Sequence, residues 1–200
     1  MEFTIASPSI VRSIKQRDLL NAWARLFVKD QRLPDYADYH PDRFEEEMPD
    51  IFLCLVEQTD GAPRIVIEAD CARMFPAYGH SGKGQTLDDY MGPQTAPIVV
   101  PIYQECIQRQ RPVYTVSKVK DVEGRPVEYE RLLMPFSDGT RVNRVVASLK
   151  AISEDGKFEI ANLMRNKESP PVAVIRSVID RDLVPNMPGR TARASEIEMS

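Results

Sequence analysis

The sequence has few of the residues that build metal or redox sites. Among its 200 residues are two histidines, His40 and His80, and three cysteines, Cys54, Cys71 and Cys106. An odd cysteine count without a CxxC pair excludes a disulfide framework and indicates a reducing compartment. Neither histidine lies near a cysteine or in an HxxxH spacing, so we expect no metal site. The cofactor, if there is one, stays unknown at this point.

Long apolar runs and an excess of basic charge are also missing. The longest uncharged run, Tyr90 to Gln104, has 15 residues and contains prolines, whereas a membrane helix needs about 20 apolar residues. Charged residues near the N-terminus argue against a signal peptide. The net charge of −4 and the pI of about 5.4 argue against a nucleic-acid-binding surface. We therefore predict a cytoplasmic protein without a membrane span or a nucleic-acid partner.

Apolar spacing predicts two main helical regions. From Ser7-Pro8 to Pro34, two slightly out-of-phase apolar stripes, the second containing Trp23 and Phe27, predict one bent helix or two helices. The best helical pattern runs from about Pro97 to Arg111. A shorter helix is expected at Thr86 to Tyr90.

Five segments have strand character. They are Ile51–Val56, Arg64–Ile67, Val113–Lys120, Val127–Phe136 and Asn143–Ile152, and Asp138-Gly139 predicts a tight hairpin between the last two. This 2 + 3 grouping cannot alternate with helices, so we predict an α+β fold with a five-stranded antiparallel sheet and helices on one face. The first strand is apolar on both faces, so the N-terminal helix is expected to cover the other face.

The pattern suggests three regions along the chain. We predict an N-terminal helical extension at 1–44, a domain at 45–153, and a C-terminal extension at 154–200 that is partly disordered. Within this last region, Val172 to Ile179 is apolar enough to form either a strand or a helix.

One stretch resembles a known family. The sequence YERLLMPFSDGT at Tyr129–Thr140 resembles the YxRLLLPLSxDG signature of a PAS-like family common in alphaproteobacteria. Upstream residues similar to that family's pattern are Trp23, Arg32-Leu33-Pro34, Pro41 and Met48-Pro49-Asp50-Ile51; Asp35-Tyr36 departs from it. The resemblance implies a bacterial PAS sensor or interaction module in signal transduction. Such modules bind a small molecule between sheet and helices or a partner protein, and they dimerise.

Four residues are candidates for ligand binding: Tyr103 and Cys106 on the long helix, and Tyr129 and Arg131 on the signature strand. The two-residue period of a strand places Tyr129 and Arg131 on one face. Arg131 either pairs with a nearby carboxylate, which could be Glu128, Glu130 or an acidic residue of the neighbouring helix, or anchors an anionic ligand. Strand parity alone leaves open whether that face is the pocket side.

Other chemistry finds less support. Cys71 lacks the neighbours of a flavin photosensor, and the histidines are poorly placed for haem. The glycine-rich stretch GHSGKG at 79–84 lacks the GxxxxGK[ST] phosphate-loop spacing. No catalytic residues are assigned, and a non-enzymatic module is predicted.

Two alternatives to the sensor remain. One is an acid/base isomerase on a cone-shaped sheet, using Tyr103 with Glu105 or Tyr129 with Glu130. The other is a protein-interaction domain without a ligand. A homodimer is predicted because the wide apolar stripe of the N-terminal helix needs cover.

Overall fold

The computed structural model describes residues 2–30, 32–73, 75–153, 159–163 and 171–180. Its strands are β1 (Thr4–Ala6), β2 (Ile51–Glu57), β3 (Arg64–Ala69), β4 (Val113–Lys120), β5 (Pro126–Ser137), β6 (Val142–Ile152) and β7 (Val172–Ile179). Its α-helices are α1 (Ile14–Asp30), α2 (Phe44–Glu47), α3 (Phe75–Tyr78), α4 (Leu87–Arg109) and α5 (Ile160–Leu163). Short 3-10 turns occur at Pro8–Ile10, Tyr36–Asp38 and Met48–Asp50.

The strands form one sheet in the order β1-β7-β4-β5-β6-β2-β3. The five strands predicted from the sequence are adjacent and antiparallel, from β4 to β3. The prediction of a five-stranded antiparallel sheet is nevertheless wrong in two respects. The sheet has seven strands, because β7 pairs along the open edge of β4, and it is mixed, because β1 runs parallel to β7.

The predicted hairpin between β5 and β6 is present. Gly139 has φ +101°, a conformation that favours glycine. Its N–H donates to the Ser137 hydroxyl at 2.9 Å. The two strands then pair along their length, from Ser137 opposite Val142 to Glu128 opposite Ile152.

The long helix begins earlier than predicted. Thr86 caps α4, its hydroxyl accepting from the Asp89 N–H at 3.2 Å, and α4 absorbs the separate short helix expected at 86–90. Gly92, with φ 70° and ψ 173°, kinks the helix, and Pro93 starts its second part. Gln110 then ends α4 in a left-handed conformation before Pro112.

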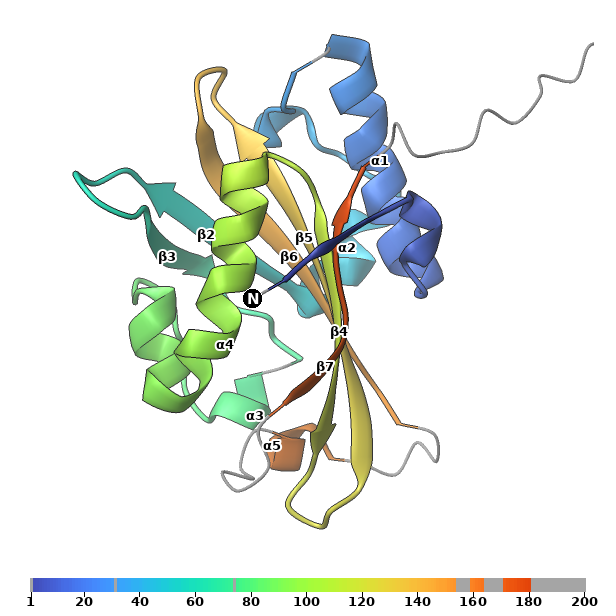
Figure 1. Ribbon diagram of the computed structural model, residues 1–200, viewed down its shortest axis with the longest axis vertical. Coiled ribbons are helices and arrows are strands. Elements are labelled where there is room, and N and C mark those ends of the chain that lie inside the picture. The colour runs from blue at the N-terminus through green and yellow to red at the C-terminus, as the bar shows by residue number, and fades with distance from the viewer. Residues whose placement is uncertain (1, 31, 74, 154–158, 164–170, 181–200) are drawn as a thin grey trace, which may run out of the picture.

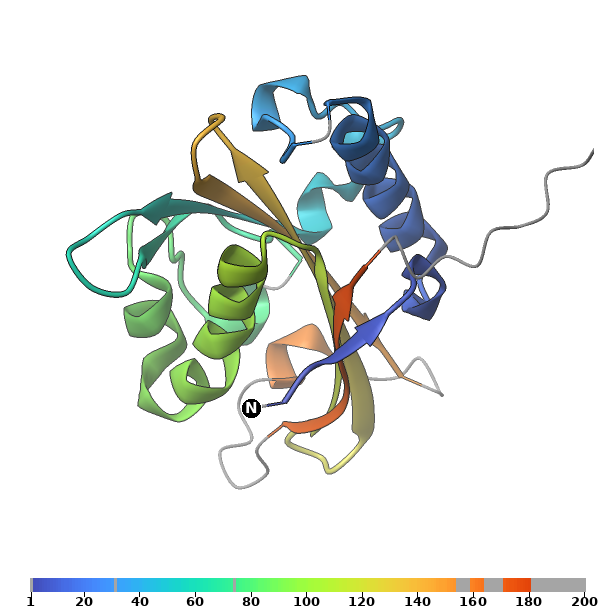
Figure 2. The same cartoon turned by 45° about the horizontal axis from the view of Figure 1, so that its top comes forward.

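Two helices cover the sheet from opposite sides, α4 on one face and α1 on the other (Figure 1, Figure 2). The first strand of the pattern, β2, contributes Phe52 and Cys54 to the α4 core and Ile51 and Leu53 to the α1 core. The expectation that the N-terminal helix covers the second face is therefore confirmed, within the same chain.

The α1 core combines aromatic packing with hydrogen bonds to the sheet. Trp23 is 4% exposed, stacks on Phe27 at 5.1 Å between ring centroids, and donates its indole N–H to the Pro135 carbonyl at 2.8 Å. Gln16 donates to the Ser148 carbonyl at 2.9 Å. These bonds fix α1 to β5 and β6.

The C-terminal extension contributes to the sheet through β7, so the strand alternative holds for residues 172–179. The partial disorder expected of residues 154–200 stays a prediction, because residues 154–158, 164–170 and 181–200 lie outside the described residues. Within the described part of the chain, no helix has the length and hydropathy to cross a membrane.

Candidate functional site

Strand β5 places Arg131 on the face covered by α4. Its neighbours of the same parity, Tyr129 and Leu133, belong to the core under α4, whereas Leu132 and Met134 belong to the core under α1. Arg131 is 5% exposed. The question that strand parity left open is thus answered: the guanidinium lies inside the layer between α4 and the sheet.

The carboxylates expected to pair with Arg131 lie elsewhere. Glu128 is bound by Arg12 at 2.6 Å and approached by Lys118 at 3.9 Å. Glu130 lies on the opposite face, where it interacts with the Tyr114 hydroxyl. Among the described residues, no carboxylate forms an ion pair with Arg131, so the purely structural interpretation of this side chain is wrong in its choice of partners.

The guanidinium of Arg131 instead lies over an aromatic ring. Its Cζ is 5.2 Å from the ring centroid of Tyr129, within cation–π range. Within the described residues, Nε of Arg131 and the hydroxyl of Tyr129 have no hydrogen bond of normal geometry, although the two side chains interact with each other. Buried polar groups are normally paired, and leaving a charged one unpaired is costly. The site therefore has unused hydrogen-bonding capacity at two adjacent side chains.

Two further tyrosines complete this cluster. Tyr103 of α4 is 1% exposed, and burial raises its pKa well above the ordinary value, with the Cys54 thiol adding to the rise and Arg131 opposing it. Burial likewise raises the pKa of Tyr129 and of Tyr78, and Arg131 opposes the rise in both. All three hydroxyls stay protonated at neutral pH and can donate hydrogen bonds.

Tyr78 was not among the predicted site residues. It lies on the four-residue helix α3, and its hydroxyl approaches the Met91 sulfur at 3.6 Å. A single tyrosine in so short an element carries no period that shows where it points. The candidate site is therefore Arg131, Tyr129, Tyr103 and Tyr78, which we call the Arg131 cluster.

Cys106 is not part of the Arg131 cluster. It is a fully buried residue of α4, where burial raises the pKa of its thiol and a hydrogen bond with the Val113 backbone opposes the rise. Cys71 is 1% exposed and donates its S–H to the Pro49 carbonyl at 3.2 Å. Both cysteines have the environment of a buried apolar residue.

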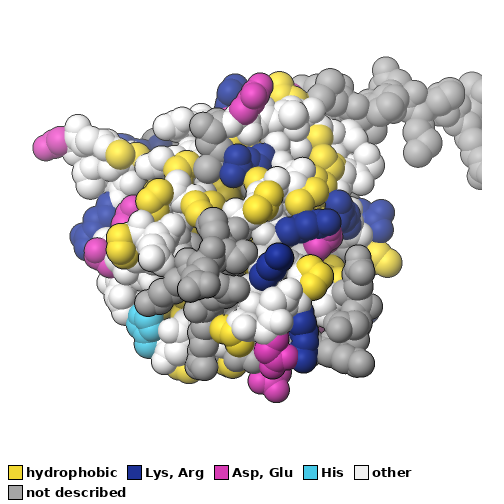
Figure 3. Space-filling model, turned by 60° about the horizontal axis from the view of Figure 1, so that its bottom comes forward, with side chains coloured by type: hydrophobic (Ala, Val, Ile, Leu, Met, Phe, Trp, Pro, Cys, Tyr) yellow, Lys and Arg dark blue, Asp and Glu magenta, His cyan; other side chains and the backbone are white. Residues whose placement is uncertain are grey.

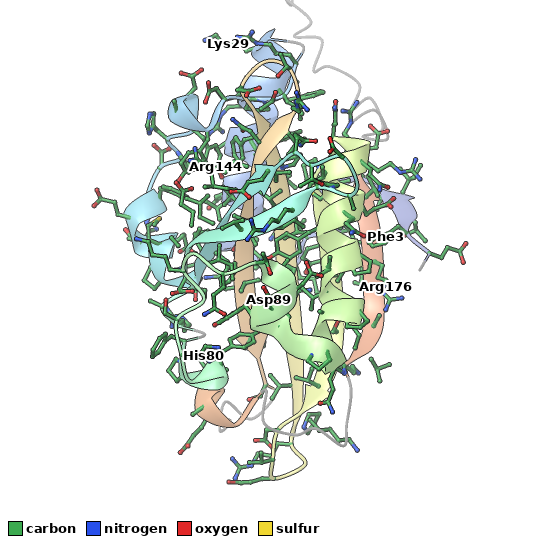
Figure 4. The ribbon with its side chains drawn as sticks, turned by 90° about the vertical axis from the view of Figure 1, so that its left-hand side faces the viewer. Phe3, Lys29, His80, Asp89, Arg144 and Arg176 are labelled. Carbon is green, nitrogen blue, oxygen red and sulfur yellow. The ribbon has the colours of Figure 1, made fainter. Side chains whose placement is uncertain are left out.

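The glycine-rich loop folds onto Asp70 and α4. The Asp70 carboxylate accepts from the Ser81 hydroxyl and from the Gly82 N–H. A Cβ at Gly82 would meet the Tyr90 ring at 2.6 Å. His80 of this loop lies at the surface (Figure 4), with its ring nitrogen Nδ1 3.0 Å from the Tyr78 carbonyl oxygen. The loop is thus held by hydrogen bonds to the Asp70 carboxylate and by the close approach of Gly82 to the Tyr90 ring.

Grooves on the described surface lie apart from the Arg131 cluster. Open grooves of about 560, 410 and 360 Å³ run along the outer side of α4, beside α2, and between β1 and β7. None of these three is lined by a residue of the cluster. In the part of the chain that the structure describes, no group of three or more His, Cys, Asp or Glu side chains could hold a metal ion.

Comparison with known families identifies the fold. A family model described as a PAS domain matches residues 11–150, which include α1, the sheet from β2 to β6, and α4. The chain belongs to the PAS domain family. A comparison with curated proteins finds no match. The YERLLMPFSDGT stretch lies inside the matched region, and its assignment to an alphaproteobacterial subgroup stays a prediction.

All four residues of the Arg131 cluster lie inside the matched PAS region. PAS domains are generally sensory or interaction modules without enzymatic activity. In this PAS domain the cluster occupies the layer between α4 and the sheet, and its free polar atoms are on β5, inside the matched region.

Proposed function

We propose that this PAS domain is a non-enzymatic sensory module that binds a small carboxylate at the Arg131 cluster. The observation that supports this is the buried guanidinium of Arg131, which lies over the Tyr129 ring, has no hydrogen-bond partner at Nε, and has no carboxylate ion pair within the described residues. A buried cation of this kind favours an anionic partner.

The chemistry of the cluster favours a carboxylate. Arg131 offers planar donors whose geometry matches two carboxylate oxygens, and tyrosine hydroxyls can donate to the same oxygens. Apolar neighbours on the same face of the strand include Leu133 and Val127, and Thr115 lies opposite Arg131 on β4. A small acid with an apolar body fits such surroundings, and Cys106 would contact such a ligand only if it extended along α4.

Thermal denaturation tests the proposal directly. The wild-type protein is heated with acetate, butyrate, succinate, citrate or inorganic phosphate, and with acetamide, butyramide and sodium chloride as controls for charge and ionic strength. A ligand at 100 times its Kd adds about 2.7 kcal/mol, which raises Tm by roughly 5–10 °C for a chain of this size. We expect a shift with at least one carboxylate and none with its amide.

Two variants assign the shift to the cluster. In Arg131→Met the shift should disappear, while the ligand-free protein should be as stable as wild type or more stable, because a buried unpaired charge is removed. Tyr129→Phe keeps the ring under the guanidinium and removes only the hydroxyl, so it should weaken binding. Equal shifts in wild type and Arg131→Met, or no shift with any anion, would refute the carboxylate site and favour a ligand-free interaction domain.

The isomerase alternative gains no support from the side-chain positions. Glu130 and Tyr129 point to opposite faces of β5. Glu105 is bound by Arg109, with Oε1 and Nε 2.9 Å apart. Neither of the two tyrosine–carboxylate pairs considered as acid and base is assembled.

The homodimer remains a separate proposal. The apolar stripe of α1, which led us to expect a dimer, is covered by the sheet of the same chain. What remains is the exposed apolar side chains Ile5, Val172 and Val174 at the β1–β7 edge. Hydrophobic side chains on one face are interspersed with Lys and Arg (Figure 3). Light scattering that gives twice the chain mass would support a dimer, and the chain mass alone would refute it.

A further inference from the structure

A line of five alternating charges runs from α1, past the end of the sheet, to the segment before α3. Its members, which we call the charge chain, are Lys15, Glu47, Lys150, Asp50 and Arg73. Lys15 and Lys150 bind the two oxygens of Glu47 at 2.7 and 2.8 Å. Lys150 also binds one oxygen of Asp50, and Arg73 lies 2.5 Å from the other. Each carboxylate therefore has two cations, and Lys150 is shared.

The two carboxylates that share Lys150 are buried, so each depends on the cations around it. Glu47 and Asp50 are 5% and 3% exposed, so water has little access to either carboxylate while its cations are in place. The side chain of Lys150 is 15% exposed, whereas those of Lys15 and Arg73 are 56% exposed. When one end cation leaves, its buried carboxylate must draw more strongly on Lys150.

One end of the chain lies beside the Arg131 cluster. Arg73 precedes α3, which carries Tyr78, and its backbone N–H donates to the Pro49 carbonyl at 2.8 Å. The same carbonyl accepts from the Cys71 thiol. The Arg73–Asp50 contact is a close ion pair in which Asp50 Oδ1 has no aligned hydrogen bond. Because the Arg73 side chain is 56% exposed, this link can be released when the segment moves.

The centre and the other end connect to the sheet and to α1. Lys150 on β6 lies opposite Glu130 on β5 in the strand register, and Glu130 lies between Tyr129 and Arg131 in the sequence. Lys15 is in the first turn of α1. The charge chain thus joins the α3 side of the ligand cluster to the start of the helix on the opposite face.

We propose that the charge chain couples the Arg131 cluster to α1, with Lys150 as a pivot between two carboxylates. Release of Arg73 leaves Asp50 dependent on Lys150, so Glu47 holds Lys15 more tightly. Release of Lys15 has the reverse effect, and Asp50 then holds Arg73 more tightly. The two ends respond with opposite sign, and the effect is reciprocal because both ends bias the same shared cation.

This coupling rests on the proposed function for the signal that moves the α3 side, but its test needs no ligand. Cys71 reports on opening beside Arg73, and its alkylation by iodoacetamide is followed by peptide mass spectrometry. Cys54 and Cys106 are fully buried and report global unfolding in the same sample. We expect Lys15→Gln to slow Cys71 alkylation relative to Cys54 and Cys106 by about fivefold or more, the lower range for coupled sites.

A matched control removes a neighbouring charge outside the chain. Arg12 lies just before α1 and forms an ion pair with Glu128. Arg12→Gln should leave the rate of Cys71 alkylation relative to Cys54 and Cys106 unchanged. The reciprocal measurement is hydrogen exchange in the first turns of α1, which Arg73→Gln should slow. In a Lys150→Gln background, Lys15→Gln should no longer affect Cys71.

An unchanged or faster alkylation ratio in Lys15→Gln would overturn the coupling, even if Lys150→Gln does not fold. Failure of the coupling can be distinguished from failure of the carboxylate site. A carboxylate shift without coupling leaves the sensor and refutes the pivot. Coupling without any carboxylate shift keeps the pivot and refutes the ligand.

Discussion

Replacing Trp23 with alanine should remove a large part of the stability of the α1 side. The indole is 4% exposed, and its truncation leaves a cavity between α1 and the sheet. Replacing a buried tryptophan with alanine costs about 3–5 kcal/mol. The change also leaves the Pro135 carbonyl without its 2.8 Å hydrogen bond, which moves the expected cost toward the upper end.

Urea unfolding followed by far-ultraviolet circular dichroism measures this cost, because Trp23 is the single tryptophan and the variant has no indole fluorescence. Trp23→Phe keeps an aromatic ring against Phe27 and loses the N–H, so it should cost about 1–3 kcal/mol. Ile14→Ala, at a position of the same helix that is 68% exposed, should change stability by less than about 0.5 kcal/mol.

The ordering of these three variants carries the test. A loss below about 1 kcal/mol in Trp23→Ala would show that α1 is not packed on the sheet in solution. The same conclusion would follow if Trp23→Ala and Ile14→Ala were equally stable.

Two other predictions concern the kink in α4 and the charge chain. Gly92→Ala should cost about 1–3 kcal/mol in urea unfolding, because φ 70° with ψ 173° is accessible essentially to glycine alone. Gly61→Ala, where a Cβ also meets nothing within 4 Å and φ is not positive, should change little, and equal effects would contradict the backbone argument. Burial raises the pKa of Glu47, but hydrogen bonds from Lys15 and Lys150 lower it more, so it lies below the ordinary 4.5. Its stabilisation is therefore full above about pH 4.5 and lost as the pH falls through the lower folded value. The stability difference between wild type and Glu47→Gln should shrink between pH 6 and pH 3, and a constant difference would contradict the pairing.

The central sheet was predictable because its strands carry local signals. The alternation along β6 and the Asp138-Gly139 turn define the hairpin with β5, and the apolar residues on both faces of β2 indicated a second covering helix. β1 has three residues and no pattern, and its partner β7 is more than 160 residues away in the sequence. No local pattern specifies a pairing at that distance.

The candidate site was predictable only in part, for a related reason. The two-residue period placed Tyr129 and Arg131 together, but the face they share depends on where α4 packs. Glu128 and Glu130 both have the opposite strand parity to Arg131, so the two-residue period already separates them from it, and Glu128 is bound by Arg12 from a segment before α1. Tyr78 joins the cluster through the packing of a four-residue helix. The face that Tyr129 and Arg131 share and the position of Tyr78 are decided by tertiary contacts.

The covering of both sheet faces and of the β4 edge has a practical consequence for shortening the chain. A fragment limited to residues 45–153 would lose α1 and uncover Leu132, Met134 and Phe136, all of which are fully buried. It would also lose β7, leaving the backbone N–H and C=O groups along one side of β4 unpaired. An apolar face beside a bare strand edge is a template for intermolecular pairing. Such a fragment should aggregate, whereas one that retains residues 2–180 should remain dispersed, so the smallest soluble unit is larger than the five-stranded core.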